Sequence, residues 1–322
     1  MAAIRELISW IEATDNICVI PHVSPDGDCL GSAMAMAVIL ERIGKKAVVA
    51  MKEPVPEMYA FLPGQEVIYA PENVPFTPEG LMFIDVAAIN RAGDRGALSG
   101  ICDNWALIDH HETNAGFAPV SLIDPDAPAT GVIISRVMDI LDIPADKLLA
   151  TLLYVAISTD TGNFSFANTT EESLLITAKL MKTGFELYDV NRRAFRLRTR
   201  ARARLLGKAL DNMAFFLDGK LAVTTLTQEM FDICGAKYEH TEGIVNVLAD
   251  IEGVEVAMTI ESRDGGKSTK SSLRSNTDFD VAKIANGFKG GGHAAAAGMN
   301  LPLSVDTAAP KMIQAVISAM EG

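Results

Sequence analysis

The first half of the chain alternates short and long apolar segments, and this alternation strongly constrains the fold. Four short runs have the length and composition of buried strands: 16–22, 47–51, 81–86 and 105–110. Four longer runs have helical character: 29–44, 129–141, 146–160 and 171–184. Strands that are apolar on both faces and alternate with helices form parallel sheets. The sequence therefore predicts an α/β fold whose N-terminal, mainly parallel sheet is flanked by helices on each side.

A basic segment follows this alternating region. Residues 191–208 contain seven arginines, one lysine and no acidic residue. Beyond it, the pattern predicts a hairpin at Asp218-Gly219, a helix near 241–251, strands at 255–262 and 268–275, and a terminal helix at 306–320. We therefore expect a catalytic domain at 1–188, a basic helical connector at 189–212 and a smaller C-terminal α/β domain at 213–322. The connector is either a solvated helix or a patch facing an anionic substrate.

Charge and composition exclude several classes of protein. The chain has 28 Lys and Arg against 41 Asp and Glu, a formal charge of −13. Proteins that coat long duplex nucleic acid need a basic surface, so that role is not expected. Bound divalent metals can still supply positive charge for a small anionic substrate. No apolar run is long enough to span a bilayer, and the four scattered cysteines suggest a reducing compartment, so we expect a cytoplasmic protein without a membrane partner.

Acidic residues and histidines follow the apolar runs at their C-terminal ends. Each position taken singly is also explained by a turn or a helix cap. Parallel strands, however, bring their C-terminal ends to one edge of the sheet, where such groups meet. Gathered carboxylates repel one another unless cations lie between them, and mixed Asp and His ligands suit Mn²⁺ or Mg²⁺. The residues concerned are His22, Asp26, Asp28, Asp85, Asp109, His110, His111 and Asp160.

Five ordered motifs resemble those of a known family. HVSPDGD at 22–28, FID at 83–85, DHH at 109–111 and STDTGNF at 158–164 resemble, in order, the four motifs of the DHH phosphoesterase superfamily. GGGH at 290–293 resembles the glycine-rich signature of the C-terminal domain that accompanies many DHH domains. The length and architecture resemble the short, two-domain branch of nano-RNases, which degrade very short oligoribonucleotides and dephosphorylate 3′-phosphoadenosine 5′-phosphate (pAp).

The resemblance implies a site for two divalent ions, with Mn²⁺ preferred over Mg²⁺. It places His22, Asp26 and Asp160 around one ion and Asp28 and His110 around the other, with Asp85 bridging both. Asp109 is expected to orient a neighbouring ligand, and His111 to face the substrate phosphate. The catalytic set is therefore His111, Asp85 and Asp109. A hydroxide held between the ions attacks the phosphoryl group in such a mechanism.

The glycines and serine of the first motif have an expected structural purpose. Gly27 is predicted to allow a tight turn between the two aspartates. Gly31 and Ser32 are predicted to open the following helix, whose N–H groups favour an anion nearby.

Substrate recognition is expected from the C-terminal domain. Arg274 can form a bidentate contact with phosphate, and Ser275 and Asn276 add neutral hydrogen bonds. Gly290, Gly291 and Gly292 are expected to offer backbone N–H groups to a phosphate, with His293 as a further donor. The alternative for the glycines is a flexible loop, but the helix-forming alanines at 294–297 favour the phosphate interpretation.

Two departures from the family pattern affect the substrate. Asn163 and Ser165 replace a usual Trp and Arg, and Lys289 stands where the glycine signature usually begins. The leading hypothesis is a metal-dependent phosphohydrolase that degrades short RNA oligonucleotides to 5′-mononucleotides and dephosphorylates pAp. The alternatives are a phosphodiesterase of cyclic or linear dinucleotides and a nucleotide-sensing module without turnover. The sequence leaves the oligomeric state open, a homodimer included.

Overall fold

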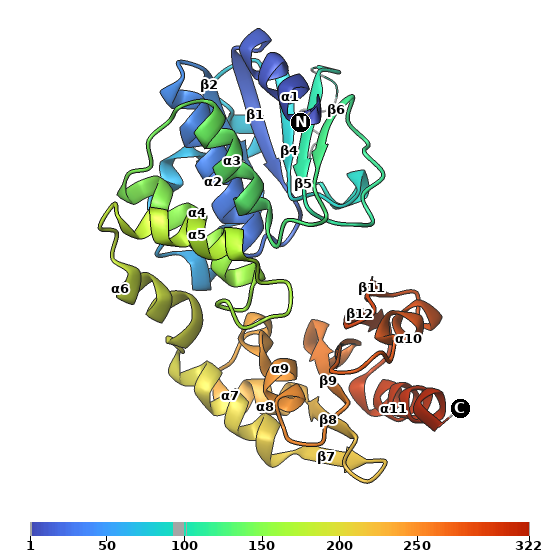
Figure 1. Ribbon diagram of the computed structural model, residues 1–322. Helices are drawn as coiled ribbons and strands as arrows, with labels where there is room; N and C mark the ends of the chain where they lie inside the picture. Colours follow the sequence, from blue (N-terminus) through green and yellow to red (C-terminus); the bar gives the residue numbers. More distant parts are fainter. Residues whose placement is uncertain (1, 93–99, 101, 322) are drawn as a thin grey trace. The chain divides into compact units, whose positions relative to one another are not determined.

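The computed structural model describes residues 2–92, 100 and 102–321 (Figure 1). Residues 1–197 and 198–322 form two compact units, and each is described by itself. The expected connector 189–212 contributes residues to both units, and the functional boundaries at 188 and 213 stay predictions.

The first unit is built on a six-stranded sheet in which every neighbouring pair is parallel. This confirms the predicted parallel α/β architecture, and the central strands β1, β4 and β5 are almost entirely buried, as parallel strands usually are. The strands, in spatial order, are β3 (Ile68–Tyr69), β2 (Lys46–Ala50), β1 (Asn16–Pro21), β4 (Gly80–Ile84), β5 (Trp105–Asp109) and β6 (Val120–Ile123).

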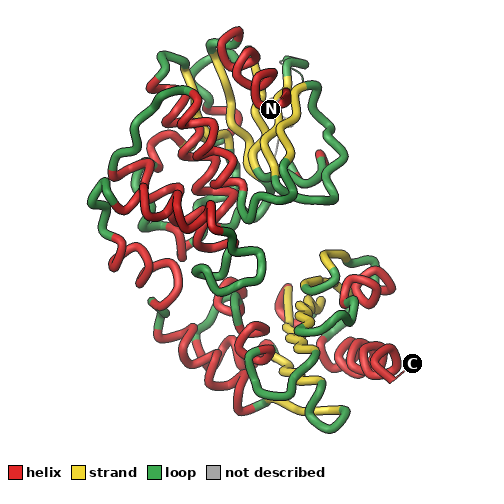
Figure 2. The backbone as a smooth tube through the Cα atoms, viewed as in Figure 1, coloured by secondary structure: helices red, strands yellow, loops and turns green. Residues whose placement is uncertain are grey.

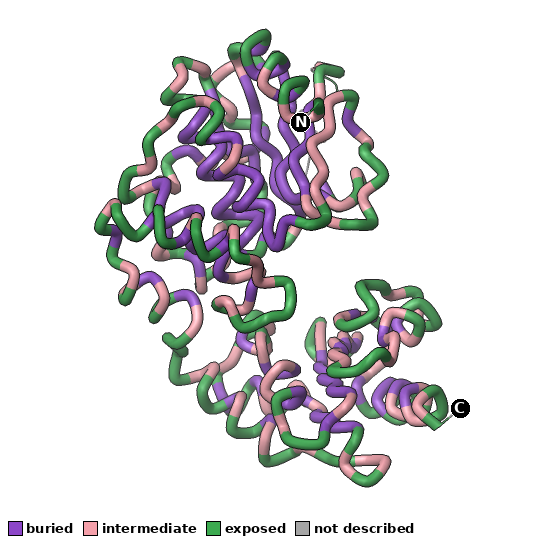
Figure 3. The backbone as a smooth tube through the Cα atoms, viewed as in Figure 1, coloured by how far each residue is buried: buried purple, intermediate pink, exposed green. Residues whose placement is uncertain are grey.

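Helices pack against one face of this sheet (Figures 1 and 2). In the described part of the chain, the other face is covered instead by loops and a short 3-10 helix (Ile89–Arg91), with Val74, Phe76 and Ile89 packed against it. Figure 3 shows α2 among the most deeply buried elements. The helices of this unit are α1 (Ala2–Ala13), α2 (Gly27–Arg42), α3 (Thr130–Ile140), α4 (Lys147–Asp160), α5 (Glu171–Met181) and α6 (Leu187–Asn191), the last continued by a π-helical turn (Arg192–Arg196).

Helix α2 packs very closely on α4 at Gly31. A Cβ atom at this position would lie 2.5 Å from the backbone oxygen of Leu152 and 3.1 Å from the Cβ of Ala156. Only glycine therefore fits without moving one helix away from the other. This contact corrects the expectation that Gly31 and Ser32 open the helix, because α2 already begins at Gly27.

The second unit contains a mixed six-stranded sheet. All neighbouring pairs are antiparallel except β8 with β9, which are parallel. In spatial order the strands are β11 (Gly291–His293), β12 (Ala296–Leu301), β10 (Ser268–Ser275), β9 (Val256–Arg263), β8 (Leu221–Leu226) and β7 (Met213–Phe216).

Both faces of the second sheet are covered by helices. One core contains residues of α10 (Val281–Gly287) and α11 (Val305–Glu321), and the other contains residues of α7 (Arg200–Asp211), α8 (Gln228–Cys234) and α9 (Ile244–Ala249).

The alanines at 294–297 do not form the predicted helix. Gly291–His293 pairs with Ala296–Leu301 as an antiparallel hairpin, and β12 also pairs with β10. The hydrogen bonds and burial gained by joining this sheet outweigh the helix propensity of alanine, which is a weak local preference.

Substitution of Gly31 with alanine should destabilise the first unit. The overpacked helix contact is expected to cost about 1–3 kcal/mol, more than the roughly 0.5–1 kcal/mol that alanine gains in a helix. Urea unfolding followed by tryptophan fluorescence measures this, because both tryptophans, Trp10 and Trp105, lie in residues 1–197.

Gly207→Ala in α7 is the matched control. Nothing lies within 4 Å of a Cβ at this position, so only the helix propensity changes. It should stabilise the second unit by about 0.5–1 kcal/mol, as followed by far-UV circular dichroism. A Gly31→Ala protein as stable as the parent would contradict the close helix contact.

Candidate metal and phosphoester site

The predicted ligands converge at the C-terminal ends of strands β1, β4 and β5. His22 follows β1, Asp85 follows β4, and Asp109 ends β5 with two histidines directly after it. Asp26 and Asp28 come from the start of α2, and Asp160 is the last residue of α4. The topology therefore brings all eight residues to one edge of the sheet, where ligands bind in open α/β folds.

Asp85 lies at the centre of this cluster. Its Oδ2 is 3.6 Å from Nε2 of His22, and its Oδ1 is 3.7 Å from Nε2 of His110. The two carboxylate oxygens thus face histidines from two different strand ends. Asp85 has a φ of 59°, a left-handed conformation that aspartate tolerates better than most residues.

His22 and His110 have the same hydrogen-bond arrangement. Nδ1 of His22 lies 2.8 Å from the backbone oxygen of Val23, and Nδ1 of His110 lies 3.2 Å from that of Ala127. A carbonyl oxygen only accepts hydrogen bonds, so Nδ1 is the protonated nitrogen of each neutral ring. Nε2, which faces the carboxylates, then carries the lone pair that a metal needs.

Asp160 lies closer to His110 than the expected division of ligands implies. Its Oδ2 is 3.4 Å from Nε2 of His110, and Asp28 Oδ2 is 3.9 Å from the same nitrogen. Asp26 lies on the other side, with its Oδ1 3.8 Å from Nε2 of His22. The ligands therefore form two groups. Asp28, His110 and Asp160 make up one group, His22 and Asp26 make up the other, and Asp85 lies next to both groups.

Asp28 is held by the start of helix α3. It accepts hydrogen bonds from the backbone N–H groups of Thr130 at 2.6 Å and Gly131 at 2.9 Å, and from the hydroxyl of Ser32 at 3.0 Å. The Thr130 hydroxyl donates to Asp85 Oδ1 at 2.8 Å. Thr130 thus orients two candidate ligands at once, a role that no sequence motif indicated.

The turn before α2 differs from its predicted geometry. Asp26 caps the helix by accepting from the backbone N–H of Cys29 at 3.0 Å. Gly27 does not have a positive φ, so tight turning is not its purpose. A Cβ there would lie 2.5 Å from the hydroxyl oxygen of Thr159, so Gly27 is needed for close approach to α4.

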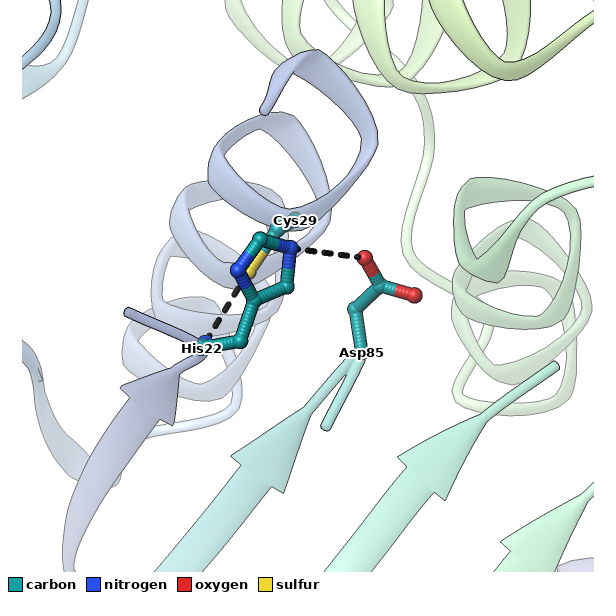
Figure 4. A group of neighbouring side chains, drawn as sticks. All are labelled: His22, Cys29 and Asp85. Carbon is teal, nitrogen blue, oxygen red and sulfur yellow. Dashed lines mark hydrogen bonds and ion pairs between the residues drawn. The ribbon is translucent and has the colours of Figure 1, made fainter. Parts of the chain in front are cut away.

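Cys29 was also missed in the sequence, because an isolated cysteine carried no pattern. Figure 4 shows it behind the ring of His22, with Asp85 facing that ring from the next strand. Its Sγ accepts from the backbone N–H of His22 at 3.2 Å and contacts the backbone oxygen of Ile84 at 3.6 Å. Burial raises the pKa of this thiol well above its usual range, so Cys29 is a neutral link between two strand ends.

Asp109 orients His111. Its Oδ1 lies 2.7 Å from Nδ1 of His111 and accepts from the backbone N–H of His110 at 2.8 Å, and its Oδ2 accepts from the side chain of Asn114. The carboxylate is fully buried and hydrogen-bonded on both oxygens. Asn114, which follows the DHH motif, is a further residue that the sequence did not indicate.

Burial and charge change the acid–base properties of the cluster. Desolvation, with repulsion from neighbouring aspartates, raises the pKa of Asp28, Asp85 and Asp160, the last to about 7. Burial alone would lower the pKa of His111, but the hydrogen bond to Asp109 and the charge of Asp85 raise it to about 9. The aspartates are therefore poorly compensated by protein groups alone.

This donor set fits divalent metal ions. Ligand atoms of Asp28, His110 and Asp160 all lie within 4.8 Å of one another, as do those of His22, Cys29 and Asp85. Carboxylate oxygens with imidazole nitrogens suit Mn²⁺ or Mg²⁺, while the neutral, internally bonded thiol is a poor ligand. A cation at these positions would also relieve the repulsion among the aspartates.

The predicted substrate residues of the second unit have different environments. Asn276 uses its side-chain amide to donate to the backbone oxygens of Ala249 and Val254, so this amide group supports the fold. Ser275 donates its hydroxyl to the backbone oxygen of Thr277. Arg274 is half-buried on β10, and its guanidinium donates to the backbone oxygen of Leu273.

Two glycines of GGGH, Gly291 and Gly292, belong to a strand rather than a loop, and Gly290 directly precedes it. Gly290 and Gly292 both approach the backbone of β12 too closely for a side chain, and Gly292 has a φ of 144°. A Cβ at Gly291 would make only an ordinary contact with Oδ1 of Asn286, at 3.9 Å, and His293 is exposed. Because β11 is the edge strand of the sheet, its outward N–H groups are not used for pairing with β12.

Asn163, at the first departure from the family pattern, has a local structural role. It accepts a hydrogen bond from Asn191 at 2.7 Å, and Asn191 also donates to the hydroxyl of Tyr154 at 2.9 Å. Asn163 therefore ties α6 to α4 within the first unit.

Comparisons with known proteins identify the family of the chain. The family described as "DHH family, N-terminal domain" matches residues 16–157, and the family described as "DHHA1 domain" matches residues 219–322. The chain belongs to the DHH phosphoesterase family, whose members are hydrolases.

Individual relatives cover almost the whole chain. The bifunctional oligoribonuclease and PAP phosphatase NrnA of Thermus thermophilus is 32% identical over 98% of this chain and 93% of its own length. The protein of the same name from Bacillus subtilis is 25% identical, with 92% of each chain covered. A solved structure, an exopolyphosphatase-related protein from Bacteroides fragilis, matches with a TM-score of 0.90 and 25% identity, covering 99% of this chain and 96% of that one. In the described residues, no helix has the length and apolarity needed to cross a membrane.

Substitution of Asp85 with asparagine should abolish most of the stabilisation that Mn²⁺ gives. In the parent protein, a metal at one hundred times its Kd should add about 2.7 kcal/mol of stability. Asparagine tolerates the left-handed backbone and can still accept from Thr130, so the metal-free protein should stay folded. Thermal unfolding with Mn²⁺ and with EDTA measures the difference.

The pH dependence of the parent has a definite sign. Groups whose pKa is raised on folding stabilise the metal-free protein at low pH, and this contribution is lost as pH rises through the folded value, about 7 for Asp160. The Mn²⁺-induced increase in melting temperature should therefore be larger at pH 8 than at pH 6. The control for Asp85→Asn is Asp142→Asn, at an exposed position that also has a positive φ, and this variant should retain the full increase. An Asp85→Asn protein with an undiminished Mn²⁺ effect would exclude Asp85 as a ligand.

Proposed function

We propose that this protein is a metal-dependent phosphohydrolase that degrades short RNA oligonucleotides to 5′-mononucleotides and removes phosphate from pAp. The observation that carries this proposal is the position of Asp85, whose two oxygens face His22 and His110 separately. The relatives named as bifunctional oligoribonucleases and PAP phosphatases support the choice of substrate.

The proposed metal site uses the residues gathered around Asp85. His22 and Asp26 would hold one ion, Asp28 and His110 the other, and Asp85 both. The resemblance assigned Asp160 to the first ion, but Asp160 lies nearer to His110 and would therefore bind the second ion. Divalent cations at these positions, Mn²⁺ or Mg²⁺, would promote ionisation of an attacking water and draw charge from the phosphoryl oxygens.

His111 would contact the phosphoryl group. Its Nδ1 is held by Asp109, which fixes the ring orientation, and Asn114 holds Asp109 in turn. A hydrogen-bond donor placed in this way stabilises negative charge that develops on a phosphoryl oxygen. Asp109 thus acts through His111, in the way that a carboxylate orients a histidine in other active sites.

The second unit would bind the nucleotide through one row of residues across three strands. Arg274 pairs in register with Ala296 of β12, and Ala296 pairs with His293 of β11. Residues in register point to the same face, and adjacent strands are about 4.8 Å apart. The guanidinium and imidazole therefore flank a small alanine, which leaves space for a phosphate or a base between them.

Edge strand β11 would add backbone contacts. The side of Gly291–His293 away from β12 presents N–H groups at the sheet edge. Such groups bind phosphate oxygens without any side chain.

The four cysteines are free thiols, in agreement with action in a reducing cytoplasm.

A panel of substrates tests the activity. The purified chain, with Mn²⁺ or Mg²⁺, should release AMP from pApA and phosphate from pAp, and should turn over cyclic di-AMP and pyrophosphate at least tenfold more slowly. Product analysis by ion-exchange chromatography measures all four. Preferred hydrolysis of cyclic di-AMP would favour the dinucleotide phosphodiesterase, and binding without turnover would favour a nucleotide sensor.

Substitution of Arg274 with glutamine should weaken substrate binding. A charge-assisted hydrogen bond contributes about 1.5–3 kcal/mol, so the KM for pApA should rise at least tenfold with a smaller change in kcat. Lys270→Gln is the matched control, since it removes one positive charge from the same face of β10 four residues away. Equal effects of the two substitutions would show that only net charge matters.

A further inference from the structure

The basic segment of the sequence forms an exposed stripe on helix α7. Arg200, Arg204 and Lys208 are spaced four residues apart, so they lie on one face of the helix. All three are exposed, while Leu205 and Ala209 on the opposite face are fully buried in the core. We call these three cations the α7 stripe.

The stripe has no acidic partner in the part of the chain that the structure describes. Arg200, Arg204 and Lys208 form no ion pair there, in contrast to Arg193, which pairs with Asp189. Arg202 differs as well, because its guanidinium donates to the backbone oxygen of Glu242 and so supports the fold. The stripe cations are thus not used to hold the second unit together.

Their placement is unfavourable for the helix itself. Like charges at i and i+4 repel, and both the Arg200–Arg204 and Arg204–Lys208 pairs have this spacing. Arg200 and Arg202 also lie in the first turn, where the helix dipole favours acidic residues and where α7 has none. Intrahelical stability therefore does not explain the stripe, whereas an anionic partner would.

The unit that carries the stripe has almost no net charge that would repel such a partner. Residues 1–197 hold 14 Lys and Arg against 26 Asp and Glu, whereas residues 198–322 hold 14 against 15. The acidic excess therefore belongs to the first unit, and the stripe lies on a nearly neutral one.

We propose that the α7 stripe is a docking site for single-stranded RNA longer than the catalytic site accepts. This inference rests on the proposed function, which makes RNA the polyanion that the protein meets. Three cations along about 12 Å of helix can follow successive phosphates of one strand, and arginine binds phosphate in a bidentate manner. Exposed Ala203 and Gly207 lie between the stripe cations, so a strand can approach the helix surface.

The test compares binding of long RNA with cleavage of short RNA. Arg200→Gln, Arg204→Gln and Lys208→Gln are combined as the stripe variant in the full-length chain. Lys267→Gln, Lys283→Gln and Lys311→Gln are combined as the control, because these exposed residues of the same unit give the same change in charge. Binding is measured with a fluorescein-labelled 12-nucleotide oligo(A) by anisotropy between 50 and 200 mM salt, with Asp85→Asn added to prevent cleavage.

The stripe variant should bind the 12-mer at least tenfold more weakly than the control variant. The slope of log affinity against log salt should decrease in magnitude by about 2, since each phosphate contact on a single strand contributes about 0.7. With Asp85 restored, kcat/KM for pApA should stay within twofold of the parent. The melting temperature should equal or exceed that of the parent, because repulsion within α7 is removed.

Three results would overturn the proposal. Equal loss of 12-mer binding in both triple variants would show a general charge effect. If the stripe variant loses pApA hydrolysis by as large a factor as it loses 12-mer binding, the stripe is part of the substrate site. Displacement of the 12-mer by poly-glutamate at equal charge concentration would indicate an acidic protein as partner. If the parent does not cleave pApA, the proposed function fails, whereas the binding comparison still decides the role of the stripe.

Discussion

Electrostatic repulsion among buried carboxylates is the constraint on which the first unit depends. Asp28 and Asp85 are almost completely buried, and their neighbours include further aspartates. Isolated buried charge is so unfavourable that a protein group normally neutralises or pairs with it. Here the histidines and the start of α3 compensate only part of the charge. A divalent cation bound at this cluster would offset the remainder.

Close backbone packing holds this unfavourable cluster in place. Gly31 lets the middle of α2 approach α4, and Gly27 lets the first residue of α2 approach Thr159. The elements that carry Asp26, Asp28 and Asp160 therefore cannot move apart independently. Cys29 and Thr130 then connect ligand-bearing segments by hydrogen bonds. Metal ligands need such surrounding contacts, because orientation as much as identity determines affinity.

The second unit uses glycine for a different reason. In β11, glycines permit a hairpin so close to β12 that side chains are excluded, and the result is an edge strand with accessible N–H groups. Sequence reasoning treated the same residues as a turn before a helix, because a run of alanines favours helix locally. These residues form strands instead, because β11 pairs with β12 and β12 pairs with β10. Such pairing between strands distant in the sequence cannot be inferred from local composition.

The sequence by itself determined the order of the longer strands and helices between residues 16 and 184, because hydrophobic periodicity and the length of an apolar run are local properties. It also located the candidate ligands, since polar residues at the ends of apolar runs have few structural explanations when they recur. Short elements such as β3 and β6 escaped notice, because two to four residues carry too little pattern.

Only the tertiary structure decided that Asp85 lies between His22 and His110, that Asp160 adjoins His110, and that Asn276 supports the fold with its amide. These facts depend on which distant segments pack together, and burial and sheet pairing over the whole chain determine that packing.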